Sequence, residues 1–319
     1  MNVISKDSYY IYNYACAEEE IPLCALEIRS LFGKDSLSQY NSIESHLLID
    51  PSRSPFISGR LDVMFQSENI KDLLEQVNTM SELASSFKVL FVKNRGDSSK
   101  ARINYENRNE IIRQVANNIR GKADMHHPEI QFAVMFVKGK WLFGPYKENQ
   151  AVWLKHKSKP YNYSTALNTR VARAVINIAV PDPKGIKVID PCCGIGTVLI
   201  EALSMGIDIV GSDINPLIMK GIRENIAYFG YKAEVRIEDI CSIEEEYDVA
   251  IIDLPYNLCS VLPEEVKVQM IQNARRFTKK LVVITIEPID TILIKSGFTI
   301  VDRCELRKRN FARQVIVCS

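Results

Sequence analysis

The chain has 319 residues and a formal charge of +1, and its length favours two or three domains with well-buried cores. Its 8 Cys residues form no C-x-x-C pair and no Cys/His spacing suited to zinc, so we expect reduced thiols and no metal site. We find no secretory leader, and no uncharged apolar run approaches the roughly 20 residues that a membrane helix needs. A cytoplasmic protein without a membrane association is therefore expected.

Charge is unevenly distributed along the chain. Residues 88–122 contain nine Lys and Arg against three acidic residues, and a second basic cluster includes Arg307, Lys308 and Arg309. Such clusters are either solvated faces or sites that bind the phosphate groups of a nucleic acid. The clusters alone leave both interpretations open.

The N-terminal part mixes strand and helix patterns. Alternation over residues 9–14 indicates a strand, and an amphipathic pattern over 18–32 indicates a helix that ends at Gly33. An irregular polar stretch follows, and residues 70–77 then resume the helical period. We expect a first α+β segment over residues 1–85.

A second segment is expected over residues 86–150, and the basic residues are concentrated in it. Its predicted elements are a strand at 87–92, a helix with inward positions from Ile111 to Ile119, and hairpin strands at 130–137 and 140–146.

From residue 151 the pattern changes to a regular alternation of strands and helices. A polar, aromatic linker over 151–168 is expected to enter a helix at 169–179. Strands are predicted at 188–190, 208–212, 233–237, 249–253, 281–286, 299–307 and 312–318, and helices at 197–205, 216–229, 264–277 and shortly before Gly297. Such alternation predicts an α/β domain over 151–319 with a mostly parallel, doubly wound, seven-stranded sheet. The last two strands are joined too tightly for a crossover helix, so the last strand should be antiparallel.

The first strand-to-helix loop of such a sheet normally contacts the ligand. Here the loop reads Asp190-Pro191-Cys192-Cys193-Gly194-Ile195-Gly196-Thr197. Leu199 stands where a dinucleotide fingerprint has its third glycine, and no G-K-[ST] follows, which disfavours NAD and P-loop nucleotides. The acid before the glycines would repel a pyrophosphate but suits a ligand with an ammonium group.

Acidic residues also follow the next two strands. Asp213 ends the second strand, where a ribose diol can be bound, and Asp239 follows the third, where an adenine amino group can be bound. Each acid alone is explained as a helix cap or a solvated loop residue. Three acids in register after three successive strands indicate a ligand site.

The fourth strand leads into Asp253-Leu254-Pro255-Tyr256. An amine conjugated to a purine is a weak nucleophile, because its lone pair is delocalised into the ring. If Asp253 and the Leu254 carbonyl accept its two N–H protons, the lone pair is aimed at a methyl donor, while Tyr256 stacks on the base. Positioning and electrostatics would then supply most of the rate. The alternative is a strand-ending turn with an incidental tyrosine.

These two motifs resemble the D-P-x-x-G-x-G-T and [DN]-x-P-Y motifs of class I amino methyltransferases. Over nearly the whole chain the pattern is similar to that of the THUMP-domain RNA methyltransferases, which make N2-methylguanosine in tRNA. The resemblance implies a class I, Rossmann-like methyltransferase domain, with S-adenosyl-L-methionine as cofactor and tRNA as partner. It also implies that residues 1–85 form a ferredoxin-like segment and residues 86–150 a THUMP-like RNA-binding module.

The resemblance implies roles for individual residues as well. The target base would be held by Asp253, Leu254, Pro255 and Tyr256. The cofactor would contact Asp190, Cys192, Gly194, Gly196, Thr197, Asp213, Ile214, Asp239, Ile240 and Thr165. Thr165 belongs to a stretch, residues 161–173, that resembles the family's segment closing over the methionine part of the cofactor.

One departure from the family leaves the target base open. The family usually has D-P-P-Y, and Leu254 replaces the first proline, as in the N-L-P-Y motif of adenine-N6 rRNA methyltransferases. We therefore expect methylation of an exocyclic amine of RNA, with guanine N2 in tRNA first and adenine N6 in rRNA or DNA as the alternative. A third interpretation is a non-catalytic RNA-binding protein that keeps the fold, and the intact motifs argue against it.

Overall fold

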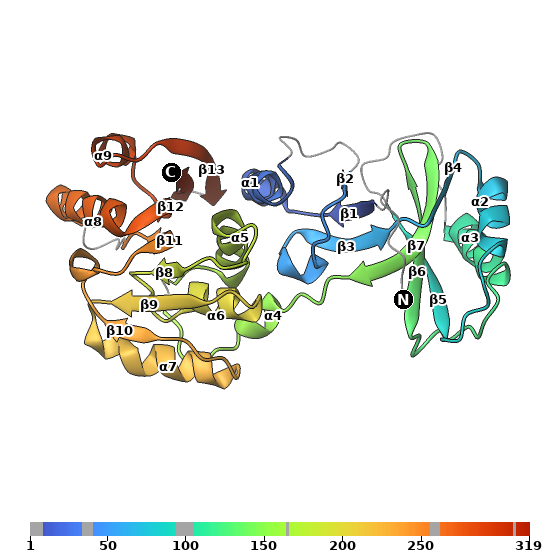
Figure 1. Cartoon of the computed structure of the whole chain (residues 1–319), viewed down its shortest axis with the longest axis horizontal. Coiled ribbons are helices and arrows are strands. Elements are labelled where there is room, and N and C mark those ends of the chain that lie inside the picture. Colours follow the sequence, from blue (N-terminus) through green and yellow to red (C-terminus); the bar gives the residue numbers. More distant parts are fainter. Residues whose placement is uncertain (1–8, 34–40, 94–104, 164–165, 256–261, 309–310) are drawn as a thin grey trace. The chain divides into compact units, whose positions relative to one another are not determined.

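The computed structural model describes residues 9–33, 41–93, 105–163, 166–255, 262–308 and 311–319 (Figure 1). The chain forms two compact units. The first comprises residues 1–15, 36–52 and 56–150, and the second comprises residues 16–35, 53–55 and 151–319.

These units differ from the expected segments 1–85, 86–150 and 151–319. No unit boundary falls near residue 85, because strands from both sides of it join one sheet. Helix α1 (Ile21–Phe32) belongs to the second unit, where its buried side chains pack against α5 (Thr169–Ala179). The division into three domains stays a prediction.

The N-terminal unit is built on a mixed sheet with the strand order β2-β1-β3-β7-β6-β5, and β4 pairs with β7. β5 and β6 are parallel, and the other neighbours are antiparallel. The strands are β1 (Tyr10–Tyr14), β2 (Ser42–Ser45), β3 (Ile57–Asp62), β4 (Phe65–Ser67), β5 (Phe87–Val92), β6 (Ile130–Val137) and β7 (Lys140–Glu148).

Helices α2 (Ile70–Asn78) and α3 (Tyr105–Asn117) pack on this sheet. Asn69 begins α2, because its side chain accepts a hydrogen bond from the Asp72 N–H and satisfies a free donor of the first turn. Leu73 of α2 and Val115 of α3 are fully buried against the aromatic side chains of the sheet. The N-terminal unit is therefore α+β, as the sequence predicts.

The second unit contains a seven-stranded sheet with the order β10-β9-β8-β11-β12-β14-β13. Its parallel part, from β10 to β12, can be followed in Figure 1. All pairs from β10 to β12 are parallel, and β14 is antiparallel to both neighbours. This confirms the predicted α/β fold with a mostly parallel sheet and an antiparallel last strand. The strands are β8 (Val188–Asp190), β9 (Ile209–Asp213), β10 (Val235–Ile237), β11 (Tyr247–Asp253), β12 (Thr278–Thr285), β13 (Ile300–Lys308) and β14 (Phe311–Cys318).

Successive side chains of the central strands point to opposite faces of this sheet. Ile252 and Val283 belong to a buried cluster with Ile271 of α8, so α8 covers their face. Ile251 and Asp253 therefore belong to the other face. The remaining helices of the unit are α4 (Trp153–His156), α6 (Thr197–Ser204), α7 (Met219–Tyr228), α8 (Glu264–Phe277) and α9 (Asp290–Lys295).

The predicted linker contains a helix, α4, which is packed into the second unit. Trp153 and His156 are buried, and His156 Nδ1 lies 2.7 Å from Glu201 Oε1 on α6. Arg173 donates to the other oxygen of the same carboxylate at 2.7 Å and stacks over the Trp153 ring. The stretch has the polar composition of a linker, but its His156 is paired in the folded unit with Glu201, which lies 45 residues later in the chain.

A buried polar cluster fixes α1 in the second unit. The Glu27 carboxylate accepts hydrogen bonds from Ser54 Oγ and, at 2.6 Å, from Asn177 Nδ2 of α5. Arg53 donates to Asn177 Oδ1 at 2.9 Å. Burial of Glu27 raises its pKa to about 7, against the opposing effect of these hydrogen bonds.

Within the described ranges, no helix combines the length and the apolar character that crossing a bilayer requires.

Candidate active site

The loop between β8 and α6 has a backbone that only glycine adopts readily. Gly194 and Gly196 have φ angles of 51° and 80°. A Cβ on Gly196 would also lie 2.8 Å from Ile222 Cγ1 of α7. The loop is held against β9 by a hydrogen bond of 3.0 Å from the Cys193 N–H to the Ser212 carbonyl.

Asp190 lies at the end of β8, where its carboxylate is almost completely buried. It accepts a hydrogen bond from the Cys192 N–H at 3.2 Å. Burial raises the pKa of Asp190 well above its ordinary value, and the nearby charges of Asp253 and Asp213 raise it further. A cation in this loop would favour the ionised form.

Asp213, at the end of β9, links two loops. Its Oδ2 accepts from the Gly194 N–H at 3.0 Å, and its Oδ1 accepts from the Asn215 N–H at 2.9 Å. Asn215 accepts in turn from the Leu217 N–H at 3.0 Å and begins the short helix Pro216–Ile218, at the start of the predicted helix 216–229. Asp213 thereby holds the glycine loop in place.

Asp239 caps a short helix and also lines a cavity. Its side chain accepts from the Cys241 N–H at 2.8 Å and begins the short helix Ile240–Ser242. The two explanations offered by the sequence, a cap and a ligand-facing acid, are therefore compatible at this position.

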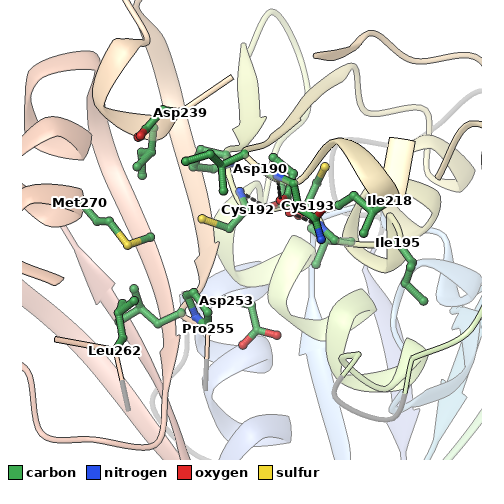
Figure 2. Close-up of a pocket in the computed structure, with 18 of the residues that line it drawn as sticks. Asp190, Cys192, Cys193, Ile195, Ile218, Asp239, Asp253, Pro255, Leu262 and Met270 are labelled. Atoms are coloured by element: carbon green, nitrogen blue, oxygen red, sulfur yellow. Dashed lines mark hydrogen bonds between the residues drawn. The ribbon is translucent and has the colours of Figure 1, made fainter. Parts of the chain in front are cut away.

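These loops surround a cavity of about 520 Å³ at the carboxyl ends of the parallel strands (Figure 2). Most of the residues singled out from the sequence line it: Asp190, Cys192, Gly194, Thr197, Asp213, Ile214, Asp239, Ile240, Asp253, Leu254 and Pro255. Gly196 does not line the cavity and instead begins α6. Thr165 and Tyr256 lie outside the described residues.

Asp253 is the last residue of β11 and lies beside Pro255, apart from Asp239 (Figure 2). Its Oδ1 is buried and has no hydrogen-bond partner in the part of the chain that the structure describes. Burial raises the pKa of Asp253 to about 6, although the positive charge of Arg313 opposes the effect. A buried acceptor without a partner is available to a donor from a ligand.

The Leu254 side chain lies on the face of the sheet opposite to that of Asp253. Its side chain is buried in the core beneath α8, and its N–H donates to the Ile284 carbonyl of β12 at 3.0 Å. The leucine side chain therefore packs in the core of the domain.

The cavity has two further walls, of which the first belongs to the stretch 161–173 that the resemblance assigns to the cofactor, and the second was missed by the sequence analysis. They consist of Tyr163, Ala166 and Leu167 before α5, and of Leu262, Val266, Gln269 and Met270 on and before α8. Val266 and Met270 have the i, i+4 spacing of one helix face, which is a signal of core packing and of cavity lining alike.

Asn225 of α7 was also missed, and it joins three separate segments. It is fully buried, and its Nδ2 donates at 3.0 Å to the carbonyls of both Tyr161 and Ile195. Its Oδ1 accepts from the Tyr161 N–H at 2.9 Å. A Cβ on Gly221, one turn earlier, would lie 3.2 Å from the Tyr161 ring, so the ring packs directly on the helix backbone.

Comparison with known proteins gives a family match that lies within the second unit. Residues 156–261 match the UPF0020 family model, described as "RMKL-like, methyltransferase domain". The tRNA (guanine(10)-N2)-dimethyltransferase of Methanothermobacter thermautotrophicus is 34% identical over 106 residues, which cover 32% of this chain and 31% of that protein. The U6 snRNA (guanine-N(2))-methyltransferase THUMPD2 of Homo sapiens is 30% identical over 118 residues, which cover 34% and 23%.

The chain thus spans about a third of the length of the first of these relatives. Among solved structures, TrmN from Thermus thermophilus is similar over 98% of this chain and 99% of its own, with 15% identity and a TM-score of 0.48. A likeness of that size does not by itself assign a function. Residues 156–261, which contain the glycine loop, therefore match a model described as a methyltransferase domain, and they belong to a unit with a mostly parallel, doubly wound sheet.

Proposed function

We propose that this protein transfers a methyl group from S-adenosyl-L-methionine to an exocyclic amine of RNA, with guanine N2 in tRNA as the target. The proposal is supported by the match to a methyltransferase family and by the similarity to tRNA and snRNA guanine-N2 methyltransferases. The observation that carries it is the buried Asp253 carboxylate oxygen, which lacks a partner among the described residues and lies at the cavity.

The lining of the cavity fits S-adenosyl-L-methionine. The cofactor carries a positive sulfonium and a positive ammonium group, and Asp190, Asp213 and Asp239 supply acidic side chains around the cavity. Thr197 Oγ1 is buried without a partner among the residues that the structure describes, so a polar ligand atom would satisfy it. When bound, the cofactor supplies a methyl group on a positively charged sulfur.

Asp253 would act on the amine. An ionised carboxylate accepts an N–H proton strongly, which draws electron density toward the nitrogen and orients its lone pair. The Leu254 carbonyl would accept the second N–H, and Pro255 would fix the turn between them. Tyr256, outside the described residues, would stack on the base.

The N-terminal unit would bind the RNA as a ferredoxin-like and THUMP-like module, in the cytoplasm. Its basic residues between 88 and 122 would neutralise phosphates, which favours binding at low salt. A base in a tRNA stem must leave its stack to reach the cavity, at a cost of about a few kcal/mol. Phosphate contacts would offset that cost.

Adenine N6 is the second candidate target, because Leu254 occupies the position that is leucine in the N-L-P-Y motif of adenine-N6 methyltransferases. Because the Leu254 side chain is buried in the core, exchanging it with proline changes the packing under the loop and leaves a backbone carbonyl at this position. The exchange therefore does not by itself select adenine over guanine.

The proposed role of Asp253 is tested by separating transfer from cofactor binding. Asp253→Ala should reduce methyl transfer to RNA by about a hundredfold or more, because a positioned acceptor contributes that much to a rate. Isothermal titration should show cofactor affinity within a factor of two to three of the unaltered protein. A variant that loses cofactor affinity and transfer together would contradict the role assigned to Asp253.

A further inference from the structure

We propose that Arg313 is a positioning residue for methyl transfer that acts through Asp253, by keeping its carboxylate ionised inside the cavity. This inference rests on the proposed function, because it assigns a partner to the carboxylate that receives the amine. Neither the motifs nor the family match single out Arg313, which lies on the last strand, outside residues 156–261.

The strand register places Arg313 on the same face of the sheet as Asp253. Asp253 pairs with Ile284 of β12, and Ile284 pairs with Val315 of β14. Directly paired residues point to the same face, and so do residues two apart on one strand. Arg313, two residues before Val315, therefore shares the face of Asp253.

The direction of β14 places Arg313 at the same edge of the sheet as well. Because β14 is antiparallel to β12, moving from Val315 back to Arg313 leads toward the carboxyl ends of the parallel strands. Asp253 ends β11 at that edge. The guanidinium and the carboxylate thus leave the same face of the sheet at the edge where the cavity lies.

The charges around Asp253 make this cation significant. Two acidic groups, Asp190 and Cys192, interact electrostatically with Asp253. Cys192 also interacts with Asp213 and Asp239, so the surroundings of Asp253 are rich in acidic groups. Arg313 attracts the Asp253 carboxylate and is itself partly buried, which lowers its pKa, while Asp253 acts to raise it. An arginine keeps its charge at any physiological pH, so it is a constant counter-charge.

Methyl transfer needs the ionised carboxylate for two reasons. A protonated acid is a weaker acceptor of the amine N–H than a carboxylate is. In addition, the nitrogen forms its bond to the methyl carbon as the carbon–sulfur bond breaks, with the electron pair going to sulfur, and the nitrogen must then lose one proton. Ionised Asp253 can accept that proton, whereas the protonated acid cannot.

The first test measures the carboxyl group directly and needs no RNA. In protein labelled with carbon-13 at the aspartate carboxyl, the Asp253 signal is assigned by its loss in Asp253→Asn and followed over pH. Its pKa should be about 6 in the unaltered protein. Arg313→Met should raise the pKa by about one, and Arg313→Lys should leave it nearly unchanged, because an opposite charge nearby lowers a carboxyl pKa by roughly one or more. An unchanged pKa in Arg313→Met would overturn the proposal.

The second test is the pH dependence of methyl transfer. For Arg313→Met the acid limb of the rate should move to higher pH, so that the loss is about fivefold larger at pH 6 than at pH 8. Arg303→Met is the matched control, because Arg303 lies on the adjacent strand β13 and pairs at the surface with Asp290. A loss that is uniform over pH would overturn the proposal in favour of direct contact with substrate.

The two tests also separate this inference from the proposed function. If the unaltered protein methylates no RNA, the proposed function fails, and the carboxyl titration still shows whether Arg313 controls the ionisation of Asp253.

Discussion

The side chain of Asn225 binds both backbone polar groups of Tyr161, accepting from its N–H at 2.9 Å and donating to its carbonyl at 3.0 Å. Asn225 also donates to the carbonyl of Ile195 in the glycine loop. One buried side chain on α7 therefore couples the glycine loop to the segment before α5. Tyr163, two residues after Tyr161, lines the cavity.

Asn225→Asp tests this coupling. A carboxylate can still accept from the Tyr161 N–H, but it cannot donate to the two carbonyls and would repel both. We expect cofactor affinity to fall by about tenfold, which corresponds to a loss of about 1.4 kcal/mol. Isothermal titration measures the affinity, and Asn273→Asp, at a partly exposed position on α8, is the control. Lower thermal stability with unchanged cofactor affinity would show that Asn225 has only a structural role.

Gly196→Ala should destabilise the domain more than the same change at Gly206. Both residues have a positive φ, 80° and 72°, which costs an alanine about 1–2 kcal/mol. At Gly196 the added Cβ would also meet Ile222 Cγ1 at 2.8 Å, whereas at Gly206 nothing lies within 4 Å. Overpacking adds about 1–3 kcal/mol, so urea unfolding should separate the two variants by that amount. Equal unfolding free energies would argue against the close approach of α7 to the loop.

Glu27 should make folding stability depend on pH. Its pKa is raised from 4.5 to about 7 in the folded protein, so between these values the folded state holds a proton that the unfolded state has released. Stability from this group therefore falls as pH rises from 4.5 to about 7 and is constant above, a total of about 3 kcal/mol.

Glu27→Gln removes this dependence, because an amide does not ionise and can still bond to Ser54 and Asn177. The free energy of unfolding of the variant, relative to the unaltered protein, should increase between pH 5 and pH 8. Urea titrations at both values measure it, with the exposed Glu19→Gln as control. A difference that does not change with pH would mean that Glu27 is ionised throughout.

The α/β part of the fold, from residue 151 onward, is predictable from the periodicity of its apolar residues. Helices α5 and α8 have the predicted bounds 169–179 and 264–277, because each presents an uninterrupted apolar face to one sheet. Strand β3 was missed, and its stretch was predicted to be irregular. Its inner positions include Gly59, where the Tyr146 hydroxyl would lie 2.1 Å from an added Cβ, so burial there depends on a residue far along the chain.

In the candidate site, too, some residues are predictable from the sequence and others are not. Acids at strand ends are predictable, because parallel strands bring their carboxyl ends to one edge whatever the loops between them. Asn225 and Arg313 are not, since their partners lie 64 residues away in the first case and on a different strand in the second. No local pattern marks either residue.

The most direct test of the account is methyl transfer from labelled S-adenosyl-L-methionine to unmodified bulk tRNA and rRNA, followed by mass spectrometry of the digested nucleosides. The account predicts label in N2-methylguanosine from tRNA, and none with Asp253→Ala. Label in N6-methyladenosine would keep the chemistry of Asp253 and replace the substrate. An absence of label in every RNA, from protein that binds the cofactor, would contradict the proposed function.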